Sequence, residues 1–129
     1  MKAITKEWVD KAESDYDVVL TLRRSRKRNR FDPICFHCQQ CAEKYLKARL
    51  IEQGMRVAKI DDLATLLHDL RNIEPLWLTM EKRLDQLSKY AVTYRYPDTT
   101  ADRAEAAYAF ATCKRMGEVA RATLGLPTR

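Results

Sequence analysis

Apolar residues recur every three or four positions along most of the chain, which is the spacing of a helix that buries one face. The first predicted helix has about 20 residues, begins at an N-cap at Thr5 and reaches the basic run near Arg26. The positions on its buried face are Trp8, Ala12, Asp15 or Tyr16, Val19 and Leu22. No run of alternating β-branched residues is long enough to indicate a strand. The pattern therefore predicts an all-α domain.

The second predicted helix is the most apolar and spans about residues 33–53. Asp32 followed by Pro33 suits an N-cap with proline in the first turn, and Gly54 is the matching stop. One face carries Ile34, Cys38, Cys41, Tyr45 and Ala48. Another face carries His37, Gln40, Lys44 and Lys47. Because apolar residues cover more than half of its circumference, we expect this helix at the centre of the domain.

Three further segments complete the predicted fold. A short helix over LATLLHDLR begins after Asp61 or Asp62, and a longer one covers LWLTMEKRLDQLSKYAV. The last helix, ADRAEAAYAFATCKRMGEVARATL, is capped by Thr99 or Thr100 and ends at Gly125. Because the connections are short, we expect an antiparallel up-and-down bundle of four main helices plus one short helix, in a single domain over residues 1–129.

The chain is basic, with 24 Lys and Arg against 18 Asp and Glu and a net charge of +6. Six of the eight residues 23–30 are basic, so much of this charge is local. The run could bind RNA phosphates, or it could be the solvated end of the first helix, where cations meet the helix dipole favourably. It contains no aromatic residue and therefore no stacking platform of its own.

The chain has no segment near the ~20 apolar residues of a membrane span and no signal-peptide core at its start, so we expect a cytoplasmic protein. Cys35, Cys38 and Cys41 have a spacing that suggests a metal site. On a regular helix, however, they splay over ~120° and cannot converge on one ion. We therefore expect no metal and no cofactor, with these residues and Cys113 as reduced core side chains.

The turn Tyr94-Arg95-Tyr96-Pro97-Asp98 is the strongest candidate binding motif. An arginine between two aromatic residues in a proline-stiffened turn offers a phosphate fork beside surfaces for a base. Arg95 could equally pair with Asp98 or Glu43 and fix the last helix to the second. The two roles are compatible if Arg95 lines a groove.

Three motifs in this order resemble the HEPN domain, the higher eukaryotes and prokaryotes nucleotide-binding domain, across about residues 5–123. The motifs are Gln40-x2-Glu43-Lys44-x2-Lys47, His68-Asp69-Leu70 and Tyr94-Arg95-Tyr96-Pro97-Asp98. The resemblance implies a helical bundle that is usually a homodimer and is often encoded beside a minimal nucleotidyltransferase. The roles that it implies are phosphate binding by Lys44, Lys47 and Arg95, a polar contact from Gln40, base stacking by Tyr94 or Tyr96, and orientation of a cation by Glu43.

HEPN ribonucleases carry an Arg-x4–6-His motif near the start of the last helix, where the paired Arg and His of a dimer cleave RNA without metal. Arg95 occupies the arginine position, but residues 96–102 contain no histidine. The resemblance therefore implies a nucleotide- or RNA-binding module, toxin-antitoxin-like or regulatory, rather than an evident enzyme. Two alternatives remain: an endoribonuclease toxin using Arg95 with His37 or His68, and a helical scaffold that only pairs with another chain.

Overall fold

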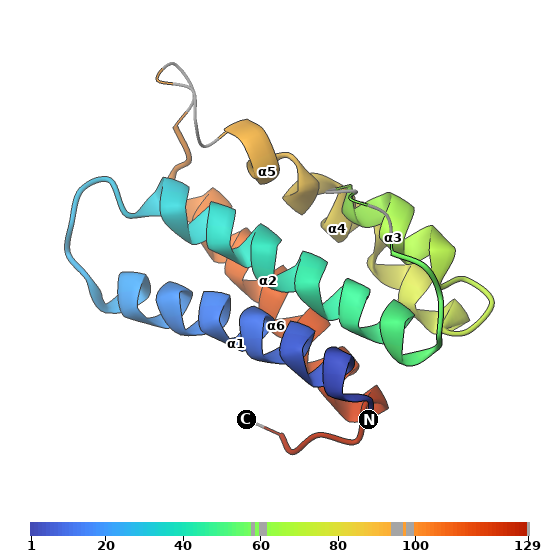
Figure 1. Ribbon diagram of the computed structural model, residues 1–129. Coiled ribbons are helices and arrows are strands. Elements are labelled where there is room, and N and C mark those ends of the chain that lie inside the picture. Colours follow the sequence, from blue (N-terminus) through green and yellow to red (C-terminus); the bar gives the residue numbers. More distant parts are fainter. Residues whose placement is uncertain (58, 60–61, 94–96, 98–99, 129) are drawn as a thin grey trace.

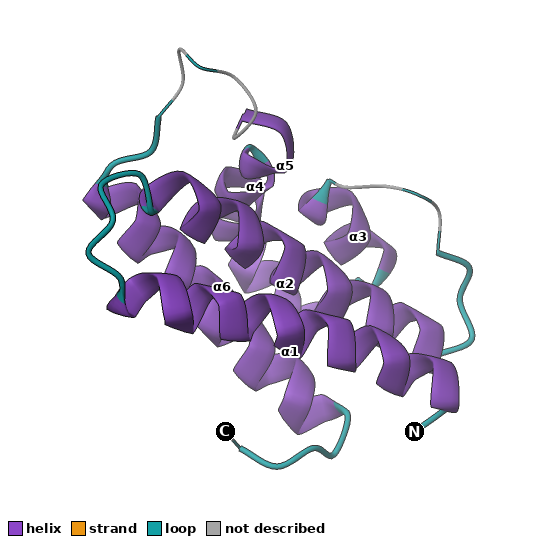
Figure 2. Cartoon of the chain, turned by 60° about the vertical axis from the view of Figure 1, so that its left-hand side comes forward, coloured by secondary structure: helices purple, strands orange, loops and turns teal. Residues whose placement is uncertain are grey.

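The computed structural model describes residues 1–57, 59, 62–93, 97 and 100–128, and within these ranges all regular structure is helical, as predicted (Figure 2). The long helices are α1 (Ala3–Arg24), α2 (Phe31–Glu52) and α6 (Arg103–Thr123). The shorter elements are α3 (Leu63–Asp69), the 3-10 helix η1 (Pro75–Met80), α4 (Glu81–Ser88) and α5 (Tyr90–Thr93). No helix in the described ranges is long and apolar enough to cross a bilayer.

The helix α2 lies at the centre of the bundle, which confirms the prediction (Figure 1). It contacts α1 on one side, α6 on another and the shorter helices on a third. The helices α1 and α6 run antiparallel, because Tyr16 stacks on Phe110 while the earlier Glu13 pairs with the later Arg121. The starts of α2 and α6 lie together, where Asp32 accepts the Ala101 N–H, so α6 runs parallel to α2 and the shorter helices between them return the chain to that end of the bundle.

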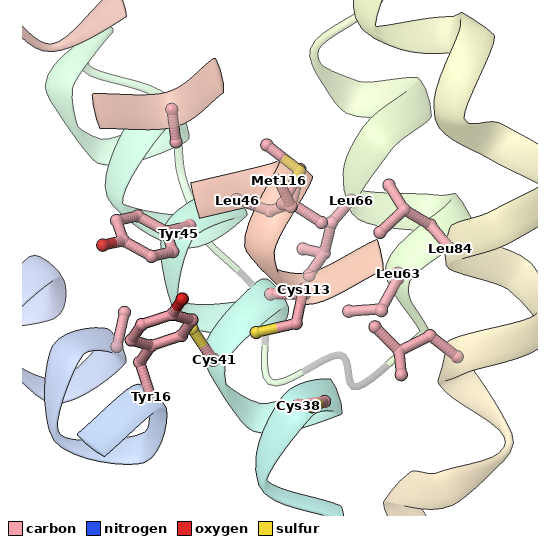
Figure 3. Packing of buried hydrophobic residues seen from close by; sticks show 14 of the residues in the cluster. Tyr16, Cys38, Cys41, Tyr45, Leu46, Leu63, Leu66, Leu84, Cys113 and Met116 are labelled. Carbon is pink, nitrogen blue, oxygen red and sulfur yellow. The ribbon is translucent and has the colours of Figure 1, made fainter. Parts of the chain in front are cut away.

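The predicted apolar face of α2 forms the middle of the core, and none of its five residues is more than 3% exposed. Figure 3 shows side chains from α1, α3, α4 and α6 converging on it, including Tyr16, Leu66, Leu84 and Met116. A fully buried leucine or methionine contributes roughly 1.5–3 kcal/mol relative to an exposed one, so this cluster is a main source of stability.

All four cysteines are buried thiols, and they pack as small core residues. Burial, together with the nearby carboxylates of Glu105 and Asp32, raises the pKa of the Cys35 thiol to about 12. The neutral thiol is a poor nucleophile and a poor metal ligand, because both kinds of chemistry require the thiolate.

Three of the predicted N-caps are wrong, and in two of them a tertiary contact takes the side chain elsewhere. The helix α1 begins at Ala3, and its buried Thr5 donates its hydroxyl to Glu52 Oε1 at 2.8 Å. The helix α2 begins at Phe31, and Asp32 Oδ1 accepts the Ala101 N–H at 2.6 Å, which ties the start of α2 to the segment before α6.

The cap of α6 is Asp102 rather than Thr100, and Thr99 lies outside the described residues. Asp102 Oδ1 accepts the Glu105 N–H at 2.7 Å, and Glu105 Oε1 accepts the Asp102 N–H at 3.3 Å. This reciprocal capping box satisfies two backbone donors that the first turn leaves free. Asp62 occupies the predicted N-cap position of α3, but its side chain makes no hydrogen bond to the backbone there and instead accepts the Thr65 hydroxyl at 2.6 Å; Asp61 lies outside the described residues.

Both predicted glycine stops are confirmed. Gly54 after α2 and Gly125 after α6 have φ angles of 78° and 73°, the left-handed conformation that glycine adopts without steric cost. Each is followed by a residue whose N–H bonds back into the last turn, Met55 to Leu50 and Leu126 to Arg121. These bonds close the C-termini as Schellman motifs.

The continuous helix predicted over residues 76–92 is wrong. The segment is divided into η1, α4 and α5, with Pro75 at the start of η1. The 3-10 turn buries Trp77 and leaves Leu76 81% exposed. Leu84 and Leu87 of α4 do face the core, so the apolar spacing located the buried side chains but not the breaks between helices.

We predict that Asp102→Ala lowers the free energy of unfolding by about 1 kcal/mol, the usual cost of losing an N-cap side chain. Urea denaturation followed by circular dichroism measures this change. Thr100→Ala is the matched control, because Thr100 is exposed and lies two residues before the cap. An equal loss from both substitutions would contradict the assignment of the cap to Asp102.

Candidate functional site

The polar face of α2 meets α1 at a buried carboxylate, Asp15. His37 Nδ1 lies 2.9 Å from Asp15 Oδ1, and Lys44 Nζ donates to Asp15 Oδ2. The Asp15 side chain is only 11% exposed. Burial by itself raises the pKa of this carboxyl, but the hydrogen bonds and charges of His37 and Lys44 outweigh burial and hold the pKa below its usual value. Asp15 is therefore ionised at neutral pH.

A second polar cluster lies further along the same face of α2. Lys47 Nζ donates to Glu43 Oε2 at 3.0 Å, and Gln39 Nε2 donates to Glu43 Oε1 at 3.2 Å. Gln40 Nε2 in turn donates to Gln39 Oε1 at 2.7 Å. The ammonium of Lys47 also lies 5.6 Å from the centroid of the Trp8 ring. Glu43 and Lys47 are both buried, so this pair is shielded from solvent.

The two lysines thus differ in what they can offer a ligand. Lys44 is 20% exposed and has three donor protons, of which Asp15 takes one. Lys47 is 7% exposed and is held by Glu43, so a phosphate would have to displace part of its surroundings to reach it. Both charges are balanced by a carboxylate, which reduces their attraction for an anion.

The two histidines lie in separate clusters. His68 is half exposed, and its Nε2 lies 3.0 Å from Glu81 Oε1 at the start of α4. His37 is 29% exposed, and the Phe36 ring meets it edge to face. A carboxylate against one ring nitrogen fixes the orientation of an imidazole and leaves the other nitrogen available for proton transfer.

The turn that carries the strongest predicted motif lies largely outside the described residues. Tyr94, Arg95, Tyr96 and Asp98 are outside them, so the expected approach of Arg95 to Lys44 stays a prediction. Pro97 is described and is exposed. Downstream of the turn, the chain is tied to α2 through the Ala101 N–H bond to Asp32.

Asp15 and Gln39 are the site residues that sequence reasoning missed. Helical spacing makes Asp15 one of two alternatives on the buried face of the first helix and gives it no role. The available signal was an acidic residue on the buried face of one helix opposite a helix that carries His37 and Lys44. An ionised side chain in such a position needs a partner of opposite charge.

The fold and the polar face of α2 define the class of protein. It is a small helical bundle whose central helix buries lysine–carboxylate pairs. The sequence model described as the HEPN domain matches residues 5–122. The chain therefore belongs to the HEPN domain family, as its motifs predicted. This membership supports a nucleotide- or RNA-related role at the level of the family. No curated protein and no solved structure matches the chain.

We predict that Asp15→Asn destabilises the protein at neutral pH by roughly 2 kcal/mol, because it leaves Lys44 and His37 without their buried partner. The folded pKa of Asp15 is depressed, so the carboxylate contributes stability above its unfolded pKa of about 3.9 and loses that contribution as the pH falls through the lower folded value. The difference between wild type and variant should therefore be large at pH 7 and shrink below about pH 4.

Urea denaturation at several pH values measures this difference. Asp10→Asn is the matched control, because Asp10 lies on the same helix but is 61% exposed and pairs with the exposed Lys6. A pH-independent difference between Asp15→Asn and wild type would show that the depressed pKa does not stabilise the fold.

Proposed function

We propose that this chain is a nucleotide- or RNA-binding HEPN-domain protein that acts as a homodimer with a minimal nucleotidyltransferase partner. The observation that carries the proposal is the family match over residues 5–122. HEPN domains often dimerise, which supports the homodimer. The role is toxin-antitoxin-like or regulatory, and the proposal retains the cytoplasmic location expected from the sequence.

The proposed binding face is formed by Gln40, Lys44 and Lys47 of α2, with Arg95 and the tyrosines that flank it. Lys44 is the best placed of the described groups, because its ammonium is partly exposed and has donors beyond the one that Asp15 accepts. Lys47 acts from inside the protein by holding Glu43 and Gln39 in place. Asp98 has a supporting role in orienting the arginine turn.

We predict that ATP, GTP or a short single-stranded RNA gives a measurable heat of binding in calorimetric titration. Lys44→Gln combined with Arg95→Gln should weaken that binding at least tenfold, which corresponds to about 1.4 kcal/mol. Glutamine is chosen because its amide can still donate to Asp15, which limits the loss of stability from removing the ammonium. Lys6→Gln is the control, since Lys6 is an exposed lysine on α1.

The absence of heat with all three ligands, for the protein alone and for its complex with a nucleotidyltransferase, would remove the proposal. If the double variant also forms that complex normally and has no phenotype, the scaffold alternative is supported instead. A phenotype with complex formation intact would exclude the scaffold.

A metal-independent endoribonuclease is the second candidate function, and one observation favours it. The buried Asp15 carboxylate orients the His37 ring through Nδ1. Among the described residues, His37 Nε2 has no hydrogen-bond partner, and it is therefore available for a substrate proton. A carboxylate–histidine pair of this kind serves general acid–base catalysis in many hydrolytic enzymes.

For this candidate we predict that the protein alone cleaves RNA in the presence of EDTA and that His37→Gln reduces the rate by about 10²- to 10⁴-fold, the usual contribution of general acid–base catalysis. His68→Gln is the matched control and should retain the wild-type rate. Gel electrophoresis of a labelled RNA measures cleavage. Intact RNA after prolonged incubation with wild-type protein would count decisively against the enzyme.

A further inference from the structure

Three arginines from separate parts of the chain line one hollow. It lies at the end of the bundle where α1 ends and α2 and α6 begin, and Figure 1 shows these three helix ends. Arg23 lies in the last turn of α1, Arg30 directly precedes α2, and Arg103 is the first residue of α6. The remaining lining residues are Phe31, Ile34, Ala106 and Ala107. We call this feature the arginine hollow.

Aromatic rings hold the guanidinium groups of the hollow by their flat faces. The Arg23 guanidinium lies 3.8 Å from the centroid of the Phe110 ring. Those of Arg30 and Arg103 lie 4.5 and 5.3 Å from the centroid of the Phe31 ring. A ring covers the face of a guanidinium but not its edge, where the N–H donors lie. Arg30 Nη1 donates to the Lys27 carbonyl at 2.8 Å, and the remaining edge donors of the three groups are left for a ligand.

The nearest acidic residues in the sequence are engaged with the backbone rather than with these arginines. Asp32 accepts the Ala101 N–H, and Asp102 accepts the Glu105 N–H. Within the described ranges, no ion pair joins Arg23, Arg30 or Arg103 to a carboxylate. Three guanidinium groups without a direct ion pair around one hollow repel one another, and an anion in the hollow would be attracted by all three.

We propose that the arginine hollow binds a backbone phosphate of single-stranded RNA. This inference rests on the proposed function and assigns its electrostatic contact to residues outside the α2 face. Arginine forks match the geometry of phosphate oxygens and form charge-assisted hydrogen bonds with them.

The size of the arginine hollow and the charges around it favour a backbone phosphate of an RNA strand over a free nucleotide. Its volume is about 240 Å³. Pockets for whole small molecules are roughly 300–1,000 Å³, so the hollow suits a phosphate group better than a complete nucleotide. The end of α1 and its connection to α2 add further exposed cations between Arg23 and Arg30 in the sequence, namely Arg24, Arg26, Lys27 and Arg28. A run of positive charge that continues beyond one phosphate site favours an extended polyanion.

The test compares two variants that remove the same charge. The hollow variant is Arg23→Gln, Arg30→Gln and Arg103→Gln, and the control variant is Arg56→Gln, Arg71→Gln and Arg115→Gln, which are exposed arginines outside the hollow. Fluorescence anisotropy with a labelled oligouridylate measures affinity at several salt concentrations. We expect the hollow variant to bind at least tenfold more weakly and the control variant to bind like wild type.

The salt dependence provides a second readout. Each phosphate contact on a single strand contributes about 0.7 to the slope of log K against log salt concentration, so loss of the one phosphate contact in the hollow should reduce the slope by about 0.7. Equal weakening by the two variants would show only a general effect of net charge and would overturn the proposal. Wild-type affinity in the hollow variant would overturn it as well.

Two further measurements separate the remaining outcomes. If the glutamine variant does not fold, Arg→Lys at the same three positions keeps the charge but loses the forks, and unchanged RNA affinity in that variant overturns the proposal. Inorganic phosphate and AMP are the free-phosphate probes, and binding of either one as tightly as RNA overturns the assignment to a strand. Loss of RNA binding in the hollow variant with ATP binding retained separates this site from the α2 face.

Failure of this proposal is distinguishable from failure of the proposed function. If the wild-type protein binds ATP or GTP but not RNA, the hollow assignment falls and nucleotide binding stands. If it binds none of these ligands, both fall together.

Discussion

The central helix carries charged side chains into the interior of the bundle, and each of them must meet a partner there. Lys44 pairs with Asp15 on α1. Arg49 pairs with Glu74, just before η1, with 3.1 Å between Arg49 Nη2 and Glu74 Oε1. An ionised group buried without a partner costs several kcal/mol, comparable with a large part of the stability of a small domain. These pairs therefore fix how α1 and the shorter helices sit against α2. The polar face of α2 is part of the framework, because the same contacts that stabilise the fold also position the candidate site.

This constraint divides the positive groups of the molecule into two kinds. Lys44 and Lys47 are compensated by carboxylates, so they can orient a ligand but add little net attraction for an anion. The arginines of the hollow are held by aromatic rings, which fix a guanidinium without neutralising its charge. On the proposed function, the end of the bundle supplies the electrostatic attraction and the α2 face supplies the positioning contacts. A protein that binds a polyanion benefits from this division, since long-range attraction and specific contacts then come from different residues.

Helical periodicity was sufficient to predict the all-α fold, the central position of α2 and both glycine stops, because these depend on local spacing and backbone freedom. The N-caps were less predictable. Several residues near each helix start can act as caps, and the choice is made by contacts far along the chain, such as that of Asp32 with Ala101. The same limit applies to the site. Asp15 is separated from His37 and Lys44 by 22 and 29 positions, and only the packing of α1 against α2 brings them together.

The basic run, residues 23–30, shows a contact that the sequence alone does not reveal. From the sequence, residues 23–30 contain no aromatic group, and this excludes a stacking platform within the run. The fold supplies rings from outside it, because Phe31 and Phe110 contact the guanidinium groups of Arg30 and Arg23. Those ring faces are then already covered, so they are not open to bases. The hollow can recognise the charge and shape of a phosphate but not the identity of a nucleotide. Any discrimination among bases must therefore come from exposed polar or aromatic groups elsewhere, and the tyrosines beside Arg95 are the sequence's best candidates for it.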